Sequence, residues 1–192
     1  MGGQVDMLNI VTICGSLRKG SYNAALIRAL PALAPAGMTF TASPSIGEIP
    51  HYDFDVQTGG FPASVTAFAD AIRSADGVII VSPEYNWTIP GMLKNAIDWV
   101  SRMKDQPFKG KPVALQSASI ALLGGSRAQY HMRQCLVSVD AQCFGRPEVI
   151  VTHANQKFDE KTLEFTDQQG RDIVKQQLEA FAAFVKKING YP

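Results

Sequence analysis

Short apolar runs alternate with segments of helical periodicity along the whole chain. Five runs have the length and the composition of β-strands: 7–14, 38–43, 76–83, 111–119 and 148–152. Apolar residues recur at helical spacing in five other segments: 22–33, 61–72, 90–103, 126–139 and 174–188. Residues 44–55 are rich in turn formers and are expected to form a connection.

The alternation of strands and helices predicts a parallel sheet with right-handed crossovers and helices on both faces. Five strands and five helices fit the smaller doubly wound α/β arrangement, a flavodoxin-like fold with strand order 2-1-3-4-5. No linker or repeat interrupts the pattern, so residues 1–192 are expected to form a single domain. Ligands of such sheets bind beyond the carboxyl ends of the strands, where three loops lie: 15–23, 83–91 and 117–127.

Composition narrows the classes of function. The chain is 46% apolar and 18% charged, and its formal net charge of +1 provides no field that attracts nucleic acid or an anionic membrane. The apolar runs are shorter than the roughly 18 residues of a membrane span, and the amino-terminal residues lack the apolar core of a signal peptide. Three cysteines without a CxxC motif suit a reducing compartment. We therefore expect a cytoplasmic protein without nucleic-acid or membrane partners.

The histidines carry no sign of a metal centre. His51, His131 and His153 are dispersed, without the spacing of metal ligands and without an accompanying carboxylate motif. We predict no metal site.

The first loop, "GSLRKGSYN", has the composition of an anion site. It lacks the GxGxxG pattern of dinucleotide folds, and Ser21 occupies the position of the lysine in a P-loop. Ser16, Ser21 and Asn23 offer hydrogen-bond donors and Arg18 a planar cation, next to the positive end of a helix. This set suits a terminal phosphate monoester held without a metal, because each charge-assisted bond contributes about 1.5–3 kcal/mol. The alternative is a solvated turn in which Ser21 only caps the helix.

The second loop, "SPEYNWTIPG", is stiffened by two prolines. We expect the backbone N–H groups from Glu84 to Asn86 to be held at fixed positions, while Tyr85 and Trp87 provide flat apolar surface. This combination suits a planar heterocycle with carbonyl edges. The alternative is that the aromatic residues pack in the core or face a partner subunit.

The third loop, "SASIALLGGSRAQ", is rich in serine and glycine. Gly124 and Gly125 would let the backbone approach a ligand closely. Together, the three loops predict one site that holds a phosphate and lines a flat ring. Flavin mononucleotide (FMN) fits this combination better than any other common ligand.

The stretches "GSLRKGSYN", "SPEYNWTIPGMLKNAIDWVSR" and "GGSRAQYHMRQ" together resemble the NADPH-dependent FMN reductase family. They are most similar to its bacterial chromate- and quinone-reductase branch, which overlaps with the azoreductases, and the resemblance runs from about Leu8 to Ile188. It implies these phosphate contacts: Ser16, Arg18, Ser21 and Asn23. It implies these ring and further loop contacts: Pro83, Glu84, Tyr85, Asn86, Ser117, Gly124 and Gly125. Tyr22 joins the cofactor set at a position where relatives often carry Phe, and "SASIALLGG" departs from relatives that often have Pro or Gly after the second Ser.

The resemblance implies an FMN-dependent NAD(P)H oxidoreductase. A nicotinamide from NADPH or NADH would stack on the flavin and pass hydride to its N5 atom. A quinone or another small-molecule electron acceptor, such as chromate, a ferric chelate or an azo dye, would then take the nicotinamide's place in a ping-pong cycle. Because the flavin carries the chemistry, no catalytic side chain is predicted. Arg102 is a candidate for attracting the nicotinamide nucleotide's phosphates or an oxyanion, and the alternative is a solvated cation at a helix end.

Two features predict an oligomer. The helix at 90–103 has one apolar stripe, and a second that contains Trp99, so a partner subunit is expected to cover one of them. The resemblance implies a homodimer or homotetramer in which Tyr85, Arg127, Tyr130 and Glu148 form an intersubunit hydrogen-bond cluster. The alternative for that cluster is a surface salt bridge that contributes little.

Two other functions remain open. A flavodoxin-type electron carrier would bind the same cofactor without NAD(P)H activity, as would a regulatory flavin-binding protein. Such carriers are usually strongly acidic and hold the phosphate in a loop without arginine. The near-neutral charge and Arg18 count against a carrier.

Overall fold

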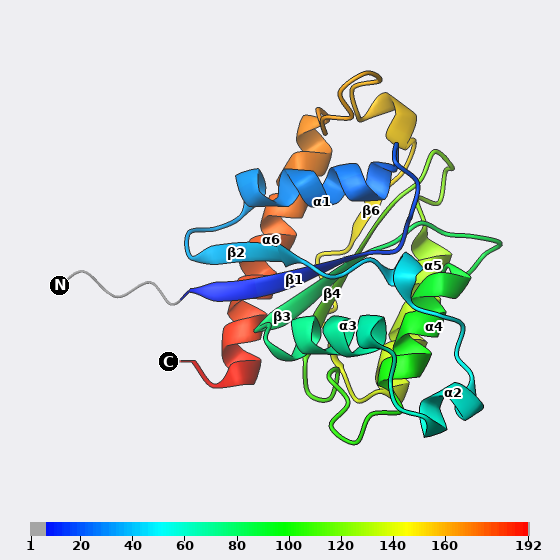
Figure 1. Ribbon diagram of the computed structural model, residues 1–192. Coiled ribbons are helices and arrows are strands. Elements are labelled where there is room, and N and C mark those ends of the chain that lie inside the picture. Colours follow the sequence, from blue (N-terminus) through cyan, green and yellow to red (C-terminus); the bar gives the residue numbers. More distant parts are fainter. Residues whose placement is uncertain (1–6, 192) are drawn as a thin grey trace.

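A computed structural model describes residues 7–191 as a parallel sheet between two layers of helices (Figure 1). The strands are β1 (Leu8–Cys14), β2 (Met38–Ala42), β3 (Gly77–Val81), β4 (Pro112–Ala118), β5 (Gln142–Cys143) and β6 (Val149–Val151). The α-helices are α1 (Tyr22–Leu33), α2 (Phe54–Thr58), α3 (Ala63–Arg73), α4 (Gly91–Val100), α5 (Ser126–Ser138) and α6 (Gln168–Asn189). Two 3₁₀ turns complete the described elements: Ile46–Glu48 and Ala154–Gln156.

Side-chain alternation along the strands builds a core on each face of the sheet. Val11 and Ile13 of β1 join the cluster that packs under α3, α4 and α5. Ile10 belongs to the cluster that packs under α1 and α6. Because β3 faces both clusters, all five of its residues are buried, which is the pattern that its apolar sequence predicts. Within residues 7–191, no helix is both long and apolar enough for a membrane span.

The predicted strand order is confirmed, and the fifth strand is divided in two. The sheet has the order β2-β1-β3-β4-β5, and β6 also pairs with β4. β5 pairs with the start of β4 at Pro112 and Val113, whereas β6 pairs with its end. Residues 144–148 leave the sheet between the two short strands. The apolar run at 148–152 predicted only the second piece.

The connection after β2 contains more structure than its turn-rich sequence predicts. It forms the first 3₁₀ turn and then α2, which begins where the Asp53 carboxylate accepts a hydrogen bond from the Asp55 N–H group at 2.8 Å. No residue of α2 is buried. A five-residue helix without an apolar face has no periodicity by which a sequence could reveal it.

This connection also covers the second apolar stripe of α4. Trp99 is 0% exposed, its Nε1 atom donates to the Pro50 carbonyl at 2.8 Å, and its ring meets the edges of Tyr52 and Phe61. The chain therefore buries Trp99 within one subunit, whereas Met92 and Met103 of the same stripe are partly buried. The assignment of Trp99 to an oligomer interface is wrong, because no part of its side chain reaches the surface. The partner subunit inferred from the two stripes stays a prediction.

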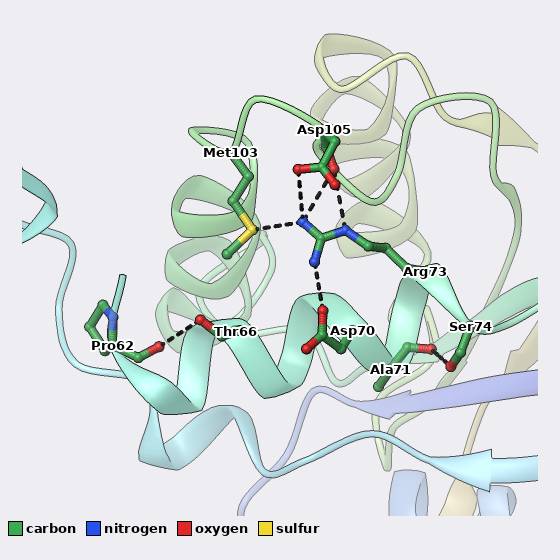
Figure 2. A network of polar contacts seen from close by, with 8 residues as sticks. All are labelled: Pro62, Thr66, Asp70, Ala71, Arg73, Ser74, Met103 and Asp105. Carbon is green, nitrogen blue, oxygen red and sulfur yellow. Dashed lines mark hydrogen bonds and ion pairs between the residues drawn. The ribbon is translucent and has the colours of Figure 1, made fainter. Parts of the chain in front are cut away.

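A polar network marks the edge of the sheet at which β3 begins (Figure 2). Arg73, at the end of α3, donates to the Asp70 carboxylate at 2.7 Å and to Asp105. Its Nη2 atom lies 3.2 Å from the Met103 sulfur. The network ties the end of α3 to the segment that follows α4. Both helices therefore end at the amino-terminal edge of the strands, opposite the loops predicted to bind a ligand.

Candidate functional site

The three predicted loops leave the carboxyl edge of the sheet (Figure 1). Residues of all three line one cleft of about 230 Å³. The predicted residues that line it are Ser16, Arg18, Ser21, Tyr22, Asn23, Pro83, Glu84 and Tyr85. Ala118, Ser119 and Ile120 complete its wall. The right-handed crossovers bring these segments together because each loop follows the end of a neighbouring strand.

The first loop provides an electropositive end of the cleft. Ser21 is the N-cap of α1, and its hydroxyl accepts from the N–H groups of Asn23 and Ala24. The N–H groups of Ser16 and Tyr22 donate to no acceptor within residues 7–191 and remain available beside the positive end of the helix. Unpaired N–H groups at a helix N-terminus form a ready anion site.

Arg18 adds a cation to this end. Its Nε and Nη2 atoms donate to the Gly20 carbonyl at 3.1 and 2.5 Å, and its guanidinium lies 5.9 Å from the centre of the Tyr22 ring. A guanidinium has five N–H donors, so this arrangement leaves donors for a ligand. The fixed position reduces the entropy lost when an anion binds.

Asn23 lines the cleft but serves the protein itself. Its Nδ2 atom donates to the Ala118 carbonyl at 3.0 Å, and its Oδ1 atom accepts from the Ala118 N–H group at 2.9 Å. Both residues are buried. The Asn23 side chain thus links the first loop to the third, and its contact with a phosphate stays a prediction.

The second loop is a tight hairpin. The N–H groups of Tyr85 and Thr88 each donate to the other residue's carbonyl, at 2.9 and 3.1 Å. The two residues between them, Asn86 and Trp87, have φ angles of 48° and 69°, as a two-residue turn with two left-handed positions requires. Because the Tyr85 N–H group is used in the turn, the predicted donors reduce to those of Glu84 and Asn86. Asn86 lies in the turn and not among the lining residues.

Four contacts hold this hairpin against α5. The Glu84 carboxylate accepts from the Ala128 N–H group at 3.2 Å and from Arg127 Nη1 at 3.4 Å. The Arg127 guanidinium lies 4.0 Å from the centre of the Trp87 ring. His131 Nδ1 lies 2.8 Å from Thr88 Oγ1. The Glu84 side chain therefore faces the helix, which leaves the backbone of this residue for the predicted ring contact.

The third loop differs from the prediction. Ser117 is 0% exposed and accepts a hydrogen bond from Gln129 Nε2 at 2.8 Å, so it lies under α5 and not in the cleft. Gly124 and Gly125 have φ angles of 59° and 94°. A Cβ atom on Gly124 would lie 2.6 Å from Ile150 Cγ2, and one on Gly125 would lie 2.8 Å from Ser117 Cβ.

The close approach that these glycines allow is therefore to strands of the same chain. Ser119 and Ile120 take the place of the predicted third-loop residues in the cleft. Sequence reasoning missed them, although they directly follow the last residue of β4. A residue's position directly after the end of a strand therefore predicted the lining of the cleft better than the glycine content of the loop did.

Cys14 lies at the end of β1, directly before the first loop. Its thiol donates to the Ser16 carbonyl at 3.3 Å, and burial raises the pKa of this thiol. The group therefore stays protonated at neutral pH and is not a nucleophile in the site. In the part of the chain that the structure describes, no three His, Cys, Asp or Glu side chains gather as possible metal ligands.

The structure does not bring Arg102 to this cleft. Arg102 follows α4, whose ten residues extend about 15 Å from the strand edge, and precedes Met103 of the network at the opposite edge (Figure 2). Its guanidinium lies 5.4 Å from the centre of the Tyr52 ring. The interpretation as a cation at a helix end describes this residue better than a role in nicotinamide binding.

The predicted interface cluster is divided between exposed and internally paired residues. Tyr85 and Tyr130 are 44% and 57% exposed. Arg127 is paired with Glu84, and Glu148 accepts from Arg133 at 3.4 Å. Within one subunit, both charged members of the cluster thus already have partners.

The strand order defines a flavodoxin-like α/β protein, and its cleft places Arg18 and the start of α1 near the aromatic residues Tyr22 and Tyr85. Residues 8–156 match the family model of NADPH-dependent FMN reductases. The chain is 51% identical over 184 residues to a quinone reductase of Escherichia coli (strain K12), covering 95% of this chain and 98% of that protein. It is 42% identical over 185 residues to an NAD(P)H-dependent FMN reductase of Pseudomonas aeruginosa, covering 96% and 99%.

Two solved structures share the fold of this chain. A flavoenzyme NAD(P)H:(acceptor) oxidoreductase from Paracoccus denitrificans superimposes with a TM-score of 0.84 at 32% identity, over 94% of this chain and 98% of that one. An FMN-dependent NADH-azoreductase from Bacillus anthracis, in complex with FMN, shares the fold at 12% identity and a TM-score of 0.60. The chain belongs to the NADPH-dependent FMN reductase family.

Proposed function

We propose that this protein is an FMN-dependent NAD(P)H oxidoreductase that reduces quinones. The observation that carries the proposal is the convergence of the Arg18 loop, the Tyr85 hairpin and the Ser119–Ile120 segment on one cleft. A phosphate requires donors and positive charge, and a flavin ring requires flat apolar surface next to backbone hydrogen-bonding groups. The cleft offers both, so its residues fit FMN.

The phosphate would lie between the start of α1 and the Arg18 guanidinium, in reach of the N–H groups of Ser16 and Tyr22. The ring would lie against Pro83 and Tyr85, with the third-loop segment at its other edge. Bound FMN would supply the hydride chemistry, taking hydride from NADPH or NADH and passing it to a second substrate in a ping-pong cycle. The protein's own contribution is to bind the group, orient it and leave one ring face open.

Quinones are the first acceptor class to test, because the relative that shares 51% of its residues is named a quinone reductase. A face that accepts a planar nicotinamide also suits a planar quinone. Chromate, ferric chelates and azo dyes are further candidate acceptors, because they too could take electrons from the reduced flavin.

We also propose that the protein is a homodimer or homotetramer in the cytoplasm. Exposed aromatic and aliphatic side chains occur in the hairpin, in the third loop and on α5: Tyr85, Trp87, Ile120, Leu122 and Tyr130. Such a group of apolar side chains favours burial against a second subunit. Three free cysteines support a reducing compartment.

Stopped-flow mixing of the FMN-loaded protein with NADPH, and separately with NADH, tests this proposal. We expect rapid loss of flavin absorbance, followed by recovery when a quinone is added, and parallel initial-velocity lines in steady state. A flavin that is reduced only after a separate reductase is added would identify an electron carrier instead. Direct reduction without turnover on quinones, chromate, ferric chelates or azo dyes would favour a regulatory flavin-binding protein.

A further inference from the structure

A second cavity opens at the carboxyl edge of the sheet, on the other side of the first loop from the cleft. Its volume is about 330 Å³, which lies in the range of small-molecule sites, roughly 300–1,000 Å³. The ends of β1 and β2, the first turns of α1 and residues 43–45 surround it. Leu17 lines this cavity, Arg18 lines the cleft, and Ser16 borders both. The first loop is therefore the wall between the two.

The polar groups at the rim of the second cavity can donate hydrogen bonds. Arg28 of α1 supplies a positive charge, and within residues 7–191 it forms no ion pair and donates no hydrogen bond. Ser45 Oγ accepts from the Gly47 N–H group at 3.2 Å, so its own proton is free for a ligand. Ser16 Oγ accepts from the Arg18 N–H group at 3.3 Å and is free in the same way.

Thr12 adds a buried hydroxyl at the floor of the cavity. It alternates with Val11 and Ile13 along β1, so its side chain faces α1. Thr12 is 3% exposed, and its Oγ1 atom donates to the Thr41 carbonyl at 3.5 Å. Hydrogen bonds between a hydroxyl and an oxygen normally span about 2.5–3.0 Å, so this contact satisfies the hydroxyl poorly. An acceptor inside the cavity would remove the cost of that poor pairing.

The remaining walls are apolar. Leu17 is 51% exposed, and Ile27 and Pro44 also line the cavity. Leu17 can lie against the segment after β2 because Gly47 has no side chain, since a Cβ atom there would lie 2.7 Å from Leu17 Cδ1. The cavity thus joins an apolar surface to a group of hydrogen-bond donors.

These two parts determine the chemistry of an occupant. No aspartate or glutamate is among the described residues that line the cavity, so a cation would have no charged partner and an anion would have Arg28. A phosphate monoester presents three acceptor oxygens at one end and a carbon body at the other. Each end therefore matches one part of the cavity.

We infer that the second cavity is a binding site for a small organic phosphate monoester. The phosphate group lies at Arg28 and the hydroxyl groups, and the carbon body lies against Leu17 and Ile27. The phosphate comes either from a separate small molecule or from the 2′-phosphate of NADPH. The site is distinct from the one proposed for FMN, because Arg28 and Thr12 do not line the cleft.

Cys14 provides a reporter for this site, because it lines the same cavity. The FMN-loaded full chain is treated with methyl methanethiosulfonate at alkaline pH, with and without phenyl phosphate, and each labelled cysteine is quantified by peptide mass spectrometry. At a phenyl phosphate concentration of about ten times its Kd, labelling of Cys14 should slow roughly tenfold, because only the unoccupied protein reacts. Cys135 and Cys143 are internal controls, since they pack against the core on the other face of the sheet and should label at unchanged rates.

An unchanged rate at Cys14 would overturn the inference, as would an equal slowing at all three cysteines. NADPH and NADH identify the source of the phosphate in the same assay. Protection by NADPH and not by NADH would assign the site to the 2′-phosphate of the dinucleotide. Protection by phenyl phosphate, with NADPH and NADH acting alike, would assign it to a separate small molecule.

Isothermal titration calorimetry with phenyl phosphate is the second measurement and does not depend on the reactivity of Cys14. Arg28→Gln should raise the Kd roughly tenfold, the lower end for a charge-assisted contact, because Arg28 is exposed. Arg146→Gln, which removes an exposed arginine outside the cavity, should leave the Kd unchanged. Thr12→Val removes the buried hydroxyl while keeping its shape and should also weaken binding.

Two results of the titration would overturn the inference: equal Kd values for the unmodified chain and Arg28→Gln, or tighter binding of benzoate than of phenyl phosphate. A failure of the proposed function is distinguishable from either. If the protein binds no FMN, Arg18→Ala and Arg28→Gln are compared in the FMN-free chain. Loss of phenyl phosphate binding with Arg28→Gln alone would support the second cavity, and loss with Arg18→Ala alone would place the ligand in the cleft.

Discussion

The link between Asn23 and Ala118 makes a prediction that separates two roles for one residue. Asn23→Ala would remove both bonds and leave the buried N–H and C=O groups of Ala118 without partners. Each unsatisfied buried group costs about 1–3 kcal/mol, so the free energy of unfolding should fall by about 2–6 kcal/mol. A loss near the middle of this range, about 4 kcal/mol, lowers the Tm of a chain of this size by roughly 8–16 °C.

The assay is urea unfolding of the FMN-free protein, followed by circular dichroism and tryptophan fluorescence. We expect a lower midpoint with an unchanged m-value, because the surface exposed on unfolding stays nearly the same. Asn155→Ala is the matched control, since this exposed asparagine lies in the second 3₁₀ turn. Its effect should stay within about 0.5 kcal/mol.

The refuting result is equally specific. If the Asn23 amide turned to bind phosphate, Asn23→Ala would leave the FMN-free protein within about 1 kcal/mol of the unmodified chain and would raise only the Kd for FMN. That outcome would show that the link to Ala118 contributes less than two buried hydrogen bonds should.

Three further predictions concern charge and protonation. Arg18→Ala should raise the Kd for FMN by roughly 10- to 150-fold, as measured by fluorescence titration. This factor is the equivalent of one charge-assisted bond of about 1.5–3 kcal/mol. An unchanged Kd would exclude Arg18 from the phosphate site. Glu84→Gln should lower the free energy of unfolding by about 1–2 kcal/mol in urea titrations, because an amide is a weaker acceptor than a carboxylate at the start of α5. The control is Glu179→Gln, at an exposed position of α6, which should have no measurable effect. Burial raises the pKa of the Cys14, Cys135 and Cys143 thiols above 9.0. The unfolded chain therefore loses these protons first, so stability should fall as the pH rises above about 9. Urea titrations should find a shallower alkaline decline in the triple Cys→Ala variant, and identical pH profiles would contradict this assignment.

The strands and the helix boundaries nearest the cleft could be predicted from the sequence because several local features agree there. Ser21 is a good N-cap, an apolar strand precedes it, and a regular apolar stripe follows it, so α1 begins and ends at the expected residues. The three loops could be placed at one edge because the topology of a doubly wound sheet requires it. The divided fifth strand was missed, because the two-residue β5 gives no apolar run of its own.

What the sequence could not provide is the identity of each residue's partner. Periodicity indicates that Trp99 is buried, but it does not say that the connection after β2 covers it. Glycines at 124 and 125 indicate a close approach of the backbone, and the structure alone shows that strands β4 and β6 lie there. Polar side chains such as Asn23 and Glu84 are consistent with a ligand or with internal hydrogen bonds until the neighbours are known.

The division of the fifth strand has a consequence for how this molecule behaves at high concentration. A long, flat strand at the border of a sheet offers unpaired backbone groups on which a strand from another molecule can add. Here that border consists of a two-residue piece and a three-residue piece with an irregular segment between them. Neither piece is long enough to template an incoming strand, so this side of the sheet is protected against edge-to-edge aggregation without needing a charged or proline-rich border strand.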